Sequence, residues 1–337
     1  KDGTIIRNEM GSLIEMEGNP KLDLSIFNEG RLYRPMQGRV WRMFPLETHR
    51  GCPYKCGYCN SPSQQVLYKE KTSSSFFRKK DFNKVRDEII MFRDEYKAEA
   101  FYFWADTFFA YSKKEFDEFI EMYSEFKIPF WCQTRPETVT YERIKQLTEI
   151  GMFRMAFGVE HGNYEFRKKV VGRDLTNDTV INAMKQVNDV GVPYSVNNIL
   201  GFPYETRNLV FDTIELCRKF EKSDSFTCST LVPFSGTEIR QIAESQGLIH
   251  PETICSVHNS DASILEMPQW DKQDISNLAK VFTMYIKFPK SRWPEIKKSE
   301  TDNILYDRLH AEFIDTFWAS EKNPINKEIA DAAKGLF

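Results

Sequence analysis

Hydrophobic positions between about residues 46 and 246 alternate between two periods. Short apolar runs of strand length are separated by longer stretches in which apolar residues recur at the spacing of helical turns. The runs lie at 46–50, 98–104, 129–134, 153–158, 193–199 and 225–230. Strands that alternate with helices are typical of βα units around a parallel sheet.

Five of the intervening stretches carry one apolar stripe each, which predicts helices that bury a single face. The stripes are Phe82/Val85/Ile89/Phe92, Phe116/Ile120/Tyr123, Ile144/Leu147, Val180/Met184/Val187 and Val210/Ile214/Cys217. A sixth helix is expected over about 238–246. Gly151, Gly191 and Gly247 stand where a helix would end in a left-handed residue, and Thr176 stands where an N-cap belongs.

Six βα units are too few for an eight-stranded barrel, so we expect a partial (β/α)6 TIM-like barrel of parallel strands. A doubly wound sheet is the alternative. The predicted core covers residues 46–250 and contains a long loop at 61–80, either a solvated surface loop or a flap over the site. Residues 1–45 are interpreted as a lead-in or linker that begins with a hairpin turn at Asp2-Gly3. Residues 251–337 are expected to form a helical extension that covers part of the sheet.

Composition narrows the choice of partners. The 337 residues carry 46 basic and 49 acidic side chains, a net charge of -3, which offers no general attraction to nucleic acid or to an anionic membrane. No apolar run approaches the roughly 20 residues that span a bilayer, and residues 1–8 lack the pattern of a signal peptide. We therefore expect a cytoplasmic protein.

Seven cysteines are distributed unevenly, because three of them fall within eight positions. The other four are scattered, at Cys132, Cys217, Cys228 and Cys255. This is not the spacing of a disulfide framework. We interpret the clustered thiols as metal ligands and the scattered ones as small buried apolar residues.

The clustered thiols, Cys52, Cys56 and Cys59, follow the first predicted strand at spacings of four and three. Three thiolates can bind three irons of a cubane and leave the fourth iron open to another ligand. A cofactor with amino and carboxylate groups can occupy that iron, and an electron from the cluster can then cleave the cofactor's sulfonium bond. A zinc site completed by His49 or Cys132 and an electron-transfer ferredoxin are the alternatives.

This loop, with Tyr58 just before the last cysteine, resembles the CxxxCxxC signature of the radical S-adenosylmethionine (SAM) superfamily. The resemblance implies that the three cysteines hold a 4Fe-4S cluster that cleaves SAM to a 5′-deoxyadenosyl radical. It also implies a small-molecule substrate and a low-potential electron donor such as flavodoxin or ferredoxin. Tyr58 is expected to contact adenine through its backbone, so that its side chain would tolerate exchange.

Polar or glycine-rich groups follow the other predicted strands, where a parallel barrel places its ligands. We expect a catalytic role for Asp106 and cofactor contacts at the remaining positions, which are Gly158, Glu160, Arg173, Asn197, Gly201 and Pro203. The resemblance implies that Glu160 contacts the ribose or amino group of SAM and that Arg173 pairs with its carboxylate. Structural alternatives are a helix cap for Glu160, a surface charge for Arg173 and a simple turn at 201–203.

Within the superfamily, residues 1 to about 250 are most similar to proteins whose radical domain follows a cobalamin-binding domain. The similar segments are 2–8, 47–54, 103–108 and 200–206. This resemblance implies cobalamin-dependent C-methylation. No Asp-x-His-x-x-Gly surrounds any of the five histidines, so the corrin is expected on a domain upstream of Lys1 in a longer protein or on a domain supplied separately. The alternatives are a methylthiotransferase-like or corrin-independent radical enzyme, and a zinc- or cluster-stabilised binding module.

Overall fold

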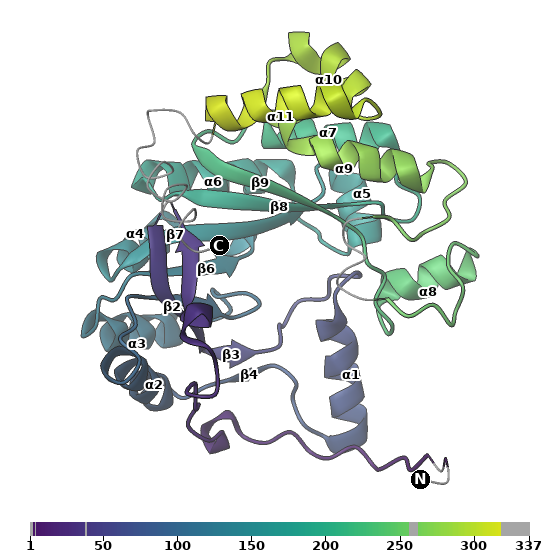
Figure 1. Cartoon of the computed structure of the whole chain (residues 1–337). Coiled ribbons are helices and arrows are strands. Elements are labelled where there is room, and N and C mark those ends of the chain that lie inside the picture. The colour runs from purple at the N-terminus through teal and green to yellow at the C-terminus, as the bar shows by residue number, and fades with distance from the viewer. Residues whose placement is uncertain (1–2, 4, 38, 256–261, 318–337) are drawn as a thin grey trace.

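A computed structural model describes residues 3, 5–37, 39–255 and 262–317. Its main feature is a curved sheet in which six strands run parallel and one short edge strand runs antiparallel (Figure 1). The strands of this sheet are β1 (Tyr33–Met36), β2 (Arg39–Glu47), β5 (Ala100–Trp104), β6 (Phe130–Thr134), β7 (Met152–Glu160), β8 (Tyr194–Leu200) and β9 (Ser223–Thr230). Two further short strands, β3 (His49–Arg50) and β4 (Arg78–Lys79), pair with each other.

The strands lie in the order β1-β2-β5-β6-β7-β8-β9, which follows the chain without a reversal. A doubly wound sheet would reverse its strand order at a switch point. The curved sheet and its surrounding helices therefore confirm the predicted partial TIM-like barrel.

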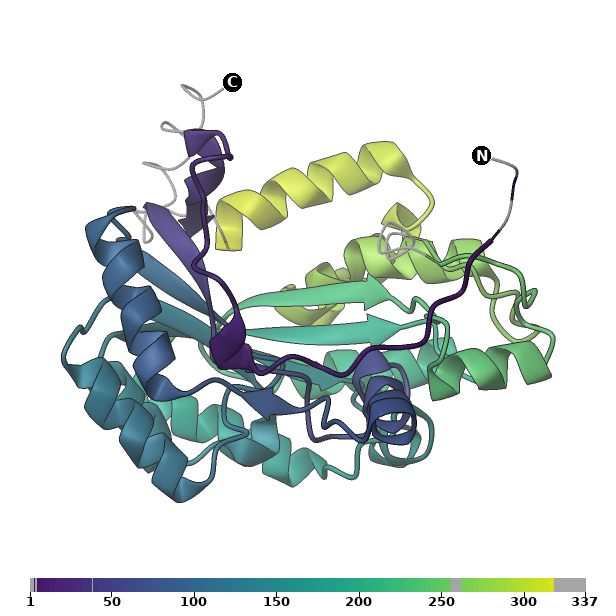
Figure 2. The same cartoon turned by 90° about the horizontal axis from the view of Figure 1, so that it is seen from below.

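Helices cover the outer side of the curved sheet, as Figure 2 shows. The described helices are α1 (Asn60–Thr72), α2 (Phe82–Asp94), α3 (Lys113–Ser124), α4 (Tyr141–Glu149), α5 (Tyr164–Phe166), α6 (Asn177–Val190), α7 (Arg207–Cys217), α8 (Glu238–Ser245), α9 (Lys272–Lys287), α10 (Trp293–Ser299) and α11 (Asn303–Phe317). Helices α1 and α8 lie beside the cysteine loop, and α10 and α11 pack on α9. The single turns are η1 (Met16–Gly18), η2 (Glu29–Leu32), η3 (Pro136–Thr138), the π-helical η4 (Arg167–Val171) and η6 (Lys290–Arg292).

Alternate residues of β5 show the two faces of the sheet. The ring of Phe103 packs against Phe119 of α3, with ring centroids 5.5 Å apart, and is buried. Its neighbour Tyr102 points the other way and stacks on Trp131 of β6 at 5.9 Å. The hydrophobic core therefore lies between the outer face of the sheet and the helices, and the inner face carries half-exposed side chains.

The predicted helix ends are confirmed. Thr176 caps α6 by accepting a hydrogen bond from the Thr179 N–H at 3.2 Å. Gly191 ends the same helix with a φ of +86°. Gly151 and Gly247, after α4 and α8, also have positive φ angles, as a left-handed helix end requires.

The first predicted strand, at residues 46–50, was wrong in both position and length. The barrel strand β2 begins at Arg39, and residues 49–50 belong to the separate β3–β4 pair. The predicted lead-in at 1–45 therefore contains β1 and most of β2. The inner face of this strand is only partly buried, so it carries polar residues, and the hydrophobic pattern did not reveal its first half. The Arg39 guanidinium, for example, lies 4.0 Å above the Trp41 ring.

The loop predicted at 61–80 was also wrong, because its first part forms helix α1. The helix buries only Ser61 and leaves Val66 55% exposed, so it has no apolar stripe to reveal it. Good helix formers such as Gln, Lys and Glu support it instead.

The C-terminal prediction of helices is confirmed for α9, α10 and α11, which gather beside α7 (Figure 1). Helix α9 packs against β9 and so covers part of the sheet, as expected. Residues 318–337 and most of the predicted turn at Asp2-Gly3 lie outside the described residues. Across the described helices, none combines the length and apolar character of a membrane span.

Candidate cofactor site

The loop from Cys52 to Cys59 joins β3 to α1 and is fastened to three parts of the chain. The Cys52 N–H donates to Ser61 Oγ at 2.9 Å, which ties the loop to the start of α1. The Gly57 N–H donates to the carbonyl of Val171 in η4, and the Gly57 carbonyl accepts from Ile239 of α8, both at 3.0 Å. The loop conformation therefore depends on elements far away in the sequence.

Two of the three thiols lie beside neutral groups. Cys52 Sγ is 3.4 Å from the Thr107 hydroxyl, and Cys59 Sγ accepts from the Ser61 N–H at 3.4 Å. Burial is the main cause that raises the pKa of both thiols, and the negative charge of Asp106 adds to it. Such thiols become thiolates when a metal supplies the compensating positive charge.

The third thiol, Cys56, faces two cations. Its Sγ accepts from Arg135 Nη1 at 3.0 Å and from Arg173 Nε at 3.3 Å. A cavity of about 520 Å³ lies beside Cys56 and Cys59, between the loop, α1 and α8. The three thiols thus share one loop but differ in their electrostatic surroundings.

Among the described residues, no group of three or more His, Cys, Asp and Glu side chains is placed to bind a single metal ion. A cubane does not require such convergence, because each thiolate binds a different iron. Three thiols on one loop, with N–H donors directed at two of them, fit a 4Fe-4S cluster. The two proposed fourth ligands of a zinc site have other partners: His49 Nε2 donates to the Thr107 carbonyl at 3.0 Å, and Cys132 is buried 3.8 Å from the Met152 sulfur.

Beside the cysteine loop, Tyr58, Glu160 and Arg173 form a buried network. Arg173 Nη2 lies 3.2 Å from Glu160 Oε1 and donates to the Tyr58 hydroxyl at 3.0 Å. The Tyr58 hydroxyl in turn donates to Glu160 at 2.9 Å. Burial and the charge of Glu160 raise the pKa of Tyr58, which keeps the phenol protonated as a donor. These bonds give the Tyr58 side chain a structural part in the network, and the expectation that it would tolerate exchange remains a prediction.

Local backbone geometry places these groups. Glu160 ends β7 with a φ of +67°, a left-handed conformation that is unusual for a residue with a side chain. The π-helical turn η4 ends at Gly172, where a Cβ would lie 3.0 Å from the Gly57 nitrogen. Arg173 follows directly, and its Nη1 donates to the Gly158 carbonyl at 2.6 Å. A close glycine contact therefore brings Arg173 to the cysteine loop.

The remaining predicted residues occupy the same end of the sheet in different ways. Asp106 follows β5, and partial burial and the charge of Glu47 raise its pKa. Asn197 accepts a hydrogen bond from the Thr227 hydroxyl at 2.7 Å on the inner face. Gly201 begins a turn with a φ of +87°, and Pro203 in that turn is buried. Their cofactor contacts remain predictions.

Sequence reasoning missed Glu205, which shapes this turn. Its fully buried carboxylate accepts hydrogen bonds from the N–H groups of Gly201 and Phe202. Its other oxygen lies 2.9 Å from Nε2 of His161, which is equally buried. The only signal in the sequence was a carboxylate four residues after a glycine at a strand end.

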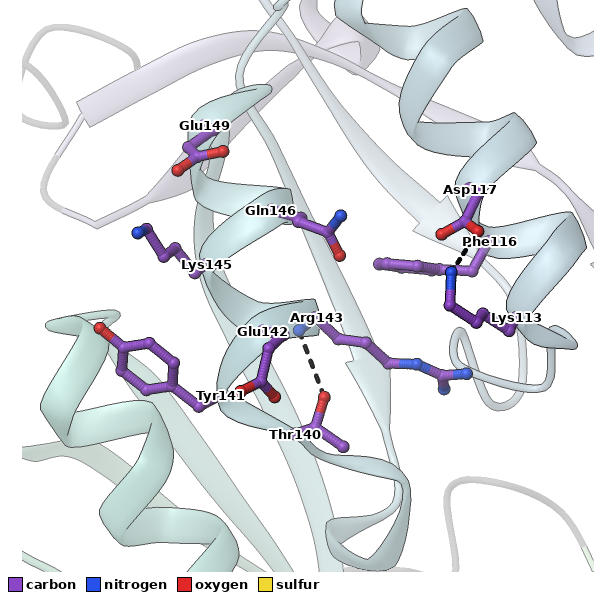
Figure 3. A pocket seen from close by; sticks show the side chains of 10 residues that line it. All are labelled: Lys113, Phe116, Asp117, Thr140, Tyr141, Glu142, Arg143, Lys145, Gln146 and Glu149. Atoms are coloured by element: carbon purple, nitrogen blue, oxygen red, sulfur yellow. Dashed lines mark hydrogen bonds and ion pairs between the residues drawn. The ribbon is translucent and has the colours of Figure 1, made fainter.

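A larger cavity, of about 700 Å³, lies on the outer surface between α3 and α4 (Figure 3). Some of its polar groups are already paired: Lys113 binds Asp117 at 2.6 Å, and Thr140 caps α4. Arg143 extends toward α3 and lies 5.1 Å from the ring of Phe116. None of the residues predicted to bind a cofactor lines this cavity.

Comparison with known proteins identifies the family of the chain. The family model described as the Radical SAM superfamily matches residues 46–217, just over half of the chain. An uncharacterized methyltransferase of Pyrococcus horikoshii is 27% identical over 204 residues, covering 60% of this chain and 42% of the relative. A cytidylyl-2-hydroxyethylphosphonate methyltransferase of Streptomyces wedmorensis is 22% identical, covering 72% of this chain and 45% of that protein. The chain thus spans less than half the length of these relatives.

Two solved structures share the fold. The cobalamin-dependent SAM radical enzyme OxsB superposes with a TM-score of 0.51 at 15% identity, covering 86% of this chain and 49% of that one. The radical SAM methyltransferase TsrM of Kitasatospora setae has a TM-score of 0.51 at 16% identity, covering 62% of this chain and 40% of that one.

Proposed function

The chain belongs to the radical SAM superfamily, whose members use a 4Fe-4S cluster and SAM, and we propose that it cleaves SAM reductively at the Cys52–Cys59 loop. In this proposal Cys52, Cys56 and Cys59 would each hold one iron of the cluster, and one iron would stay open for the amino-acid end of SAM. When bound, the cluster would supply the electron for cleavage of the sulfonium bond. A low-potential donor such as flavodoxin or ferredoxin would deliver that electron.

The buried pair of Arg173 and Glu160 carries the proposal. These opposite charges lie 3.2 Å apart beside the cysteine loop. The amino-acid end of SAM offers a carboxylate for Arg173 and amino N–H groups for Glu160. Both charges of the pair would therefore keep a hydrogen-bonding partner when SAM binds, whereas a buried charge left without one would be costly. A guanidinium can also bind a carboxylate through two parallel hydrogen bonds.

The other predicted residues complete the SAM site in this proposal. Tyr58 would orient Glu160 through its hydroxyl, and Gly158 would allow the Arg173 and Glu160 side chains to approach the strand. Asn197 and the turn at Gly201 and Pro203 would border the adenosyl group. Asp106, at the carboxyl end of β5, would contact the amino group or the substrate.

For the whole protein we propose cobalamin-dependent methyl transfer to a carbon atom of a small molecule. The two curated relatives are named as methyltransferases, and OxsB and TsrM are named as cobalamin-containing structures. These names support the reaction class. The corrin is proposed to bind outside the barrel formed by β2 to β9.

The decisive experiment is anaerobic reconstitution with iron and sulfide, followed by reduction with dithionite in the presence of SAM. We expect 5′-deoxyadenosine and methionine as products. Cys56→Ala should abolish both the cluster and the cleavage, whereas Cys217→Ala, at a buried thiol remote from the loop, should retain both. A fully loaded cluster without any cleavage would overturn the proposal. Formation of S-adenosylhomocysteine by the longer protein with added hydroxocobalamin would separately support methyl transfer.

A further inference from the structure

Arg135 has a different set of contacts from Arg173, although both donate to Cys56. The two terminal nitrogens of Arg173 reach the Gly158 carbonyl, the Tyr58 hydroxyl and Glu160, where SAM is proposed to bind. Arg135 follows β6, and none of its hydrogen bonds reaches that network. Its one contact with the metal-binding loop's sulfur atoms is the Nη1 bond to Cys56 at 3.0 Å.

Three contacts fix the Arg135 guanidinium in place. Its Nε donates to Glu137 Oε1 at 2.6 Å, and its Nη2 contacts the same carboxylate. Its plane lies over the Tyr54 ring, with the guanidinium carbon 3.9 Å from the ring centroid. Tyr54 belongs to the cysteine loop, and Arg135 itself is buried. The side chain is therefore held rigidly with one N–H directed at the Cys56 sulfur.

We propose that Arg135 is a positioning residue that sets the reduction potential of the cluster through the Cys56 sulfur. This inference rests on the proposed function, because it requires the cluster to bind at Cys56. The reduced cluster carries one more negative charge than the oxidised cluster. A buried cation and an N–H bond to a ligating sulfur stabilise that extra charge, and both are recognised determinants of the potential of iron–sulfur clusters.

Glu137 makes the proposal specific, because it predicts two shifts of opposite sign. Removing the Arg135 charge should disfavour the reduced cluster. Removing the Glu137 charge should favour it, since the cation would then be uncompensated. Glu137 is 25% exposed, so solvent screens its charge and the second effect should be smaller.

The test is a redox titration of the reconstituted protein, followed by electron paramagnetic resonance of the reduced cluster. Arg135→Gln should lower the ratio of reduced to oxidised cluster about tenfold at a fixed potential, which corresponds to about 59 mV for one electron. Glu137→Gln should raise the ratio about threefold. Arg135→Lys, which keeps the charge, should recover much of the loss. Arg143→Gln is the matched control, because this arginine also lies beside aromatic rings but sits at the outer cavity (Figure 3).

The outcomes separate this inference from the proposed function. Protein that binds no cluster after reconstitution would contradict the proposed function itself. A normal cluster whose potential is the same in the wild type, Arg135→Gln and Glu137→Gln would overturn the role of Arg135 alone. If Arg135→Gln does not fold or load iron, the sign of the Glu137→Gln shift decides, and a lowered or unchanged potential refutes the inference.

Discussion

Replacement of Glu205 by alanine is expected to be strongly destabilising, although Glu205 belongs to none of the residue groups predicted to bind metal or cofactor. The carboxylate is fully buried and accepts two hydrogen bonds, from the N–H groups of Gly201 and Phe202, the second at 3.1 Å. It also lies 2.9 Å from Nε2 of the buried His161. The substitution therefore leaves two buried N–H groups without their acceptor.

The magnitude follows from these contacts. A hydrogen bond to a charged acceptor contributes about 1.5–3 kcal/mol, so the loss of two predicts a decrease of about 3–6 kcal/mol in the free energy of unfolding. Glu205→Gln keeps the shape and one acceptor oxygen, so we expect about half of that loss. Because this turn contains Gly201 and Pro203, the Gln variant should also bind SAM more weakly.

Urea unfolding of the anaerobic apoprotein, followed by circular dichroism, measures the first effect, and equilibrium dialysis of the reconstituted Gln variant measures the second. Glu215→Ala is the control, because Glu215 is an exposed carboxylate paired with Lys290, and its loss should change stability by no more than about 0.5 kcal/mol. A loss below about 1 kcal/mol for Glu205→Ala would refute the reasoning.

Three further predictions concern the same end of the sheet. Gly158→Ala should weaken SAM binding at least tenfold in equilibrium dialysis, because the added Cβ would overlap Glu160 Oε1, and the iron content should not change. Unchanged affinity would place Glu160 outside the SAM site. Arg173→Lys should weaken SAM binding about tenfold in the same assay, or about 1.4 kcal/mol, since lysine keeps the charge but cannot make two parallel hydrogen bonds to the carboxylate. Wild-type affinity would contradict a contact between Arg173 and the SAM carboxylate. Burial lowers the pKa of His49 from 6.5 to about 4, so the native state resists protonation and stability should fall by about 3 kcal/mol as the pH drops from 6.5 to 4. His49→Gln should remove this pH dependence of the urea midpoint. If the midpoint of the variant still falls as the pH drops, other titratable groups cause the dependence.

Sequence patterns predicted the parts of the fold whose signal is local or periodic. Each outer helix with a stripe such as Val180/Met184/Val187 was found, because one buried face leaves a repeating pattern. Helix α1 was missed because it lies at the surface and buries only Ser61. Strand β2 was predicted to begin too late, because its inner face is half exposed and admits Arg39 and Trp41.

The candidate site shows the same division. The three cysteines are local in sequence, so their spacing was informative without a structure. The contacts of Cys56 with Arg135 and Arg173 join residues 79 and 117 positions apart, and no local pattern encodes such distances. The burial of Glu205 could not be predicted from its charge, because a buried carboxylate and a surface carboxylate are indistinguishable in a sequence.

The two hydrogen bonds of Gly57 have a consequence for the assembly of the holoprotein. Its N–H and carbonyl link η4 to the start of α8, so the cysteine loop bridges two segments that are more than 60 residues apart along the chain. Any rearrangement of the loop during cluster insertion would have to break these bonds. The exchange rate of the Gly57 amide hydrogen should therefore report the opening of this whole region rather than fraying of a surface loop. The same bonds that shape the loop would thus couple its movement to that of η4 and α8.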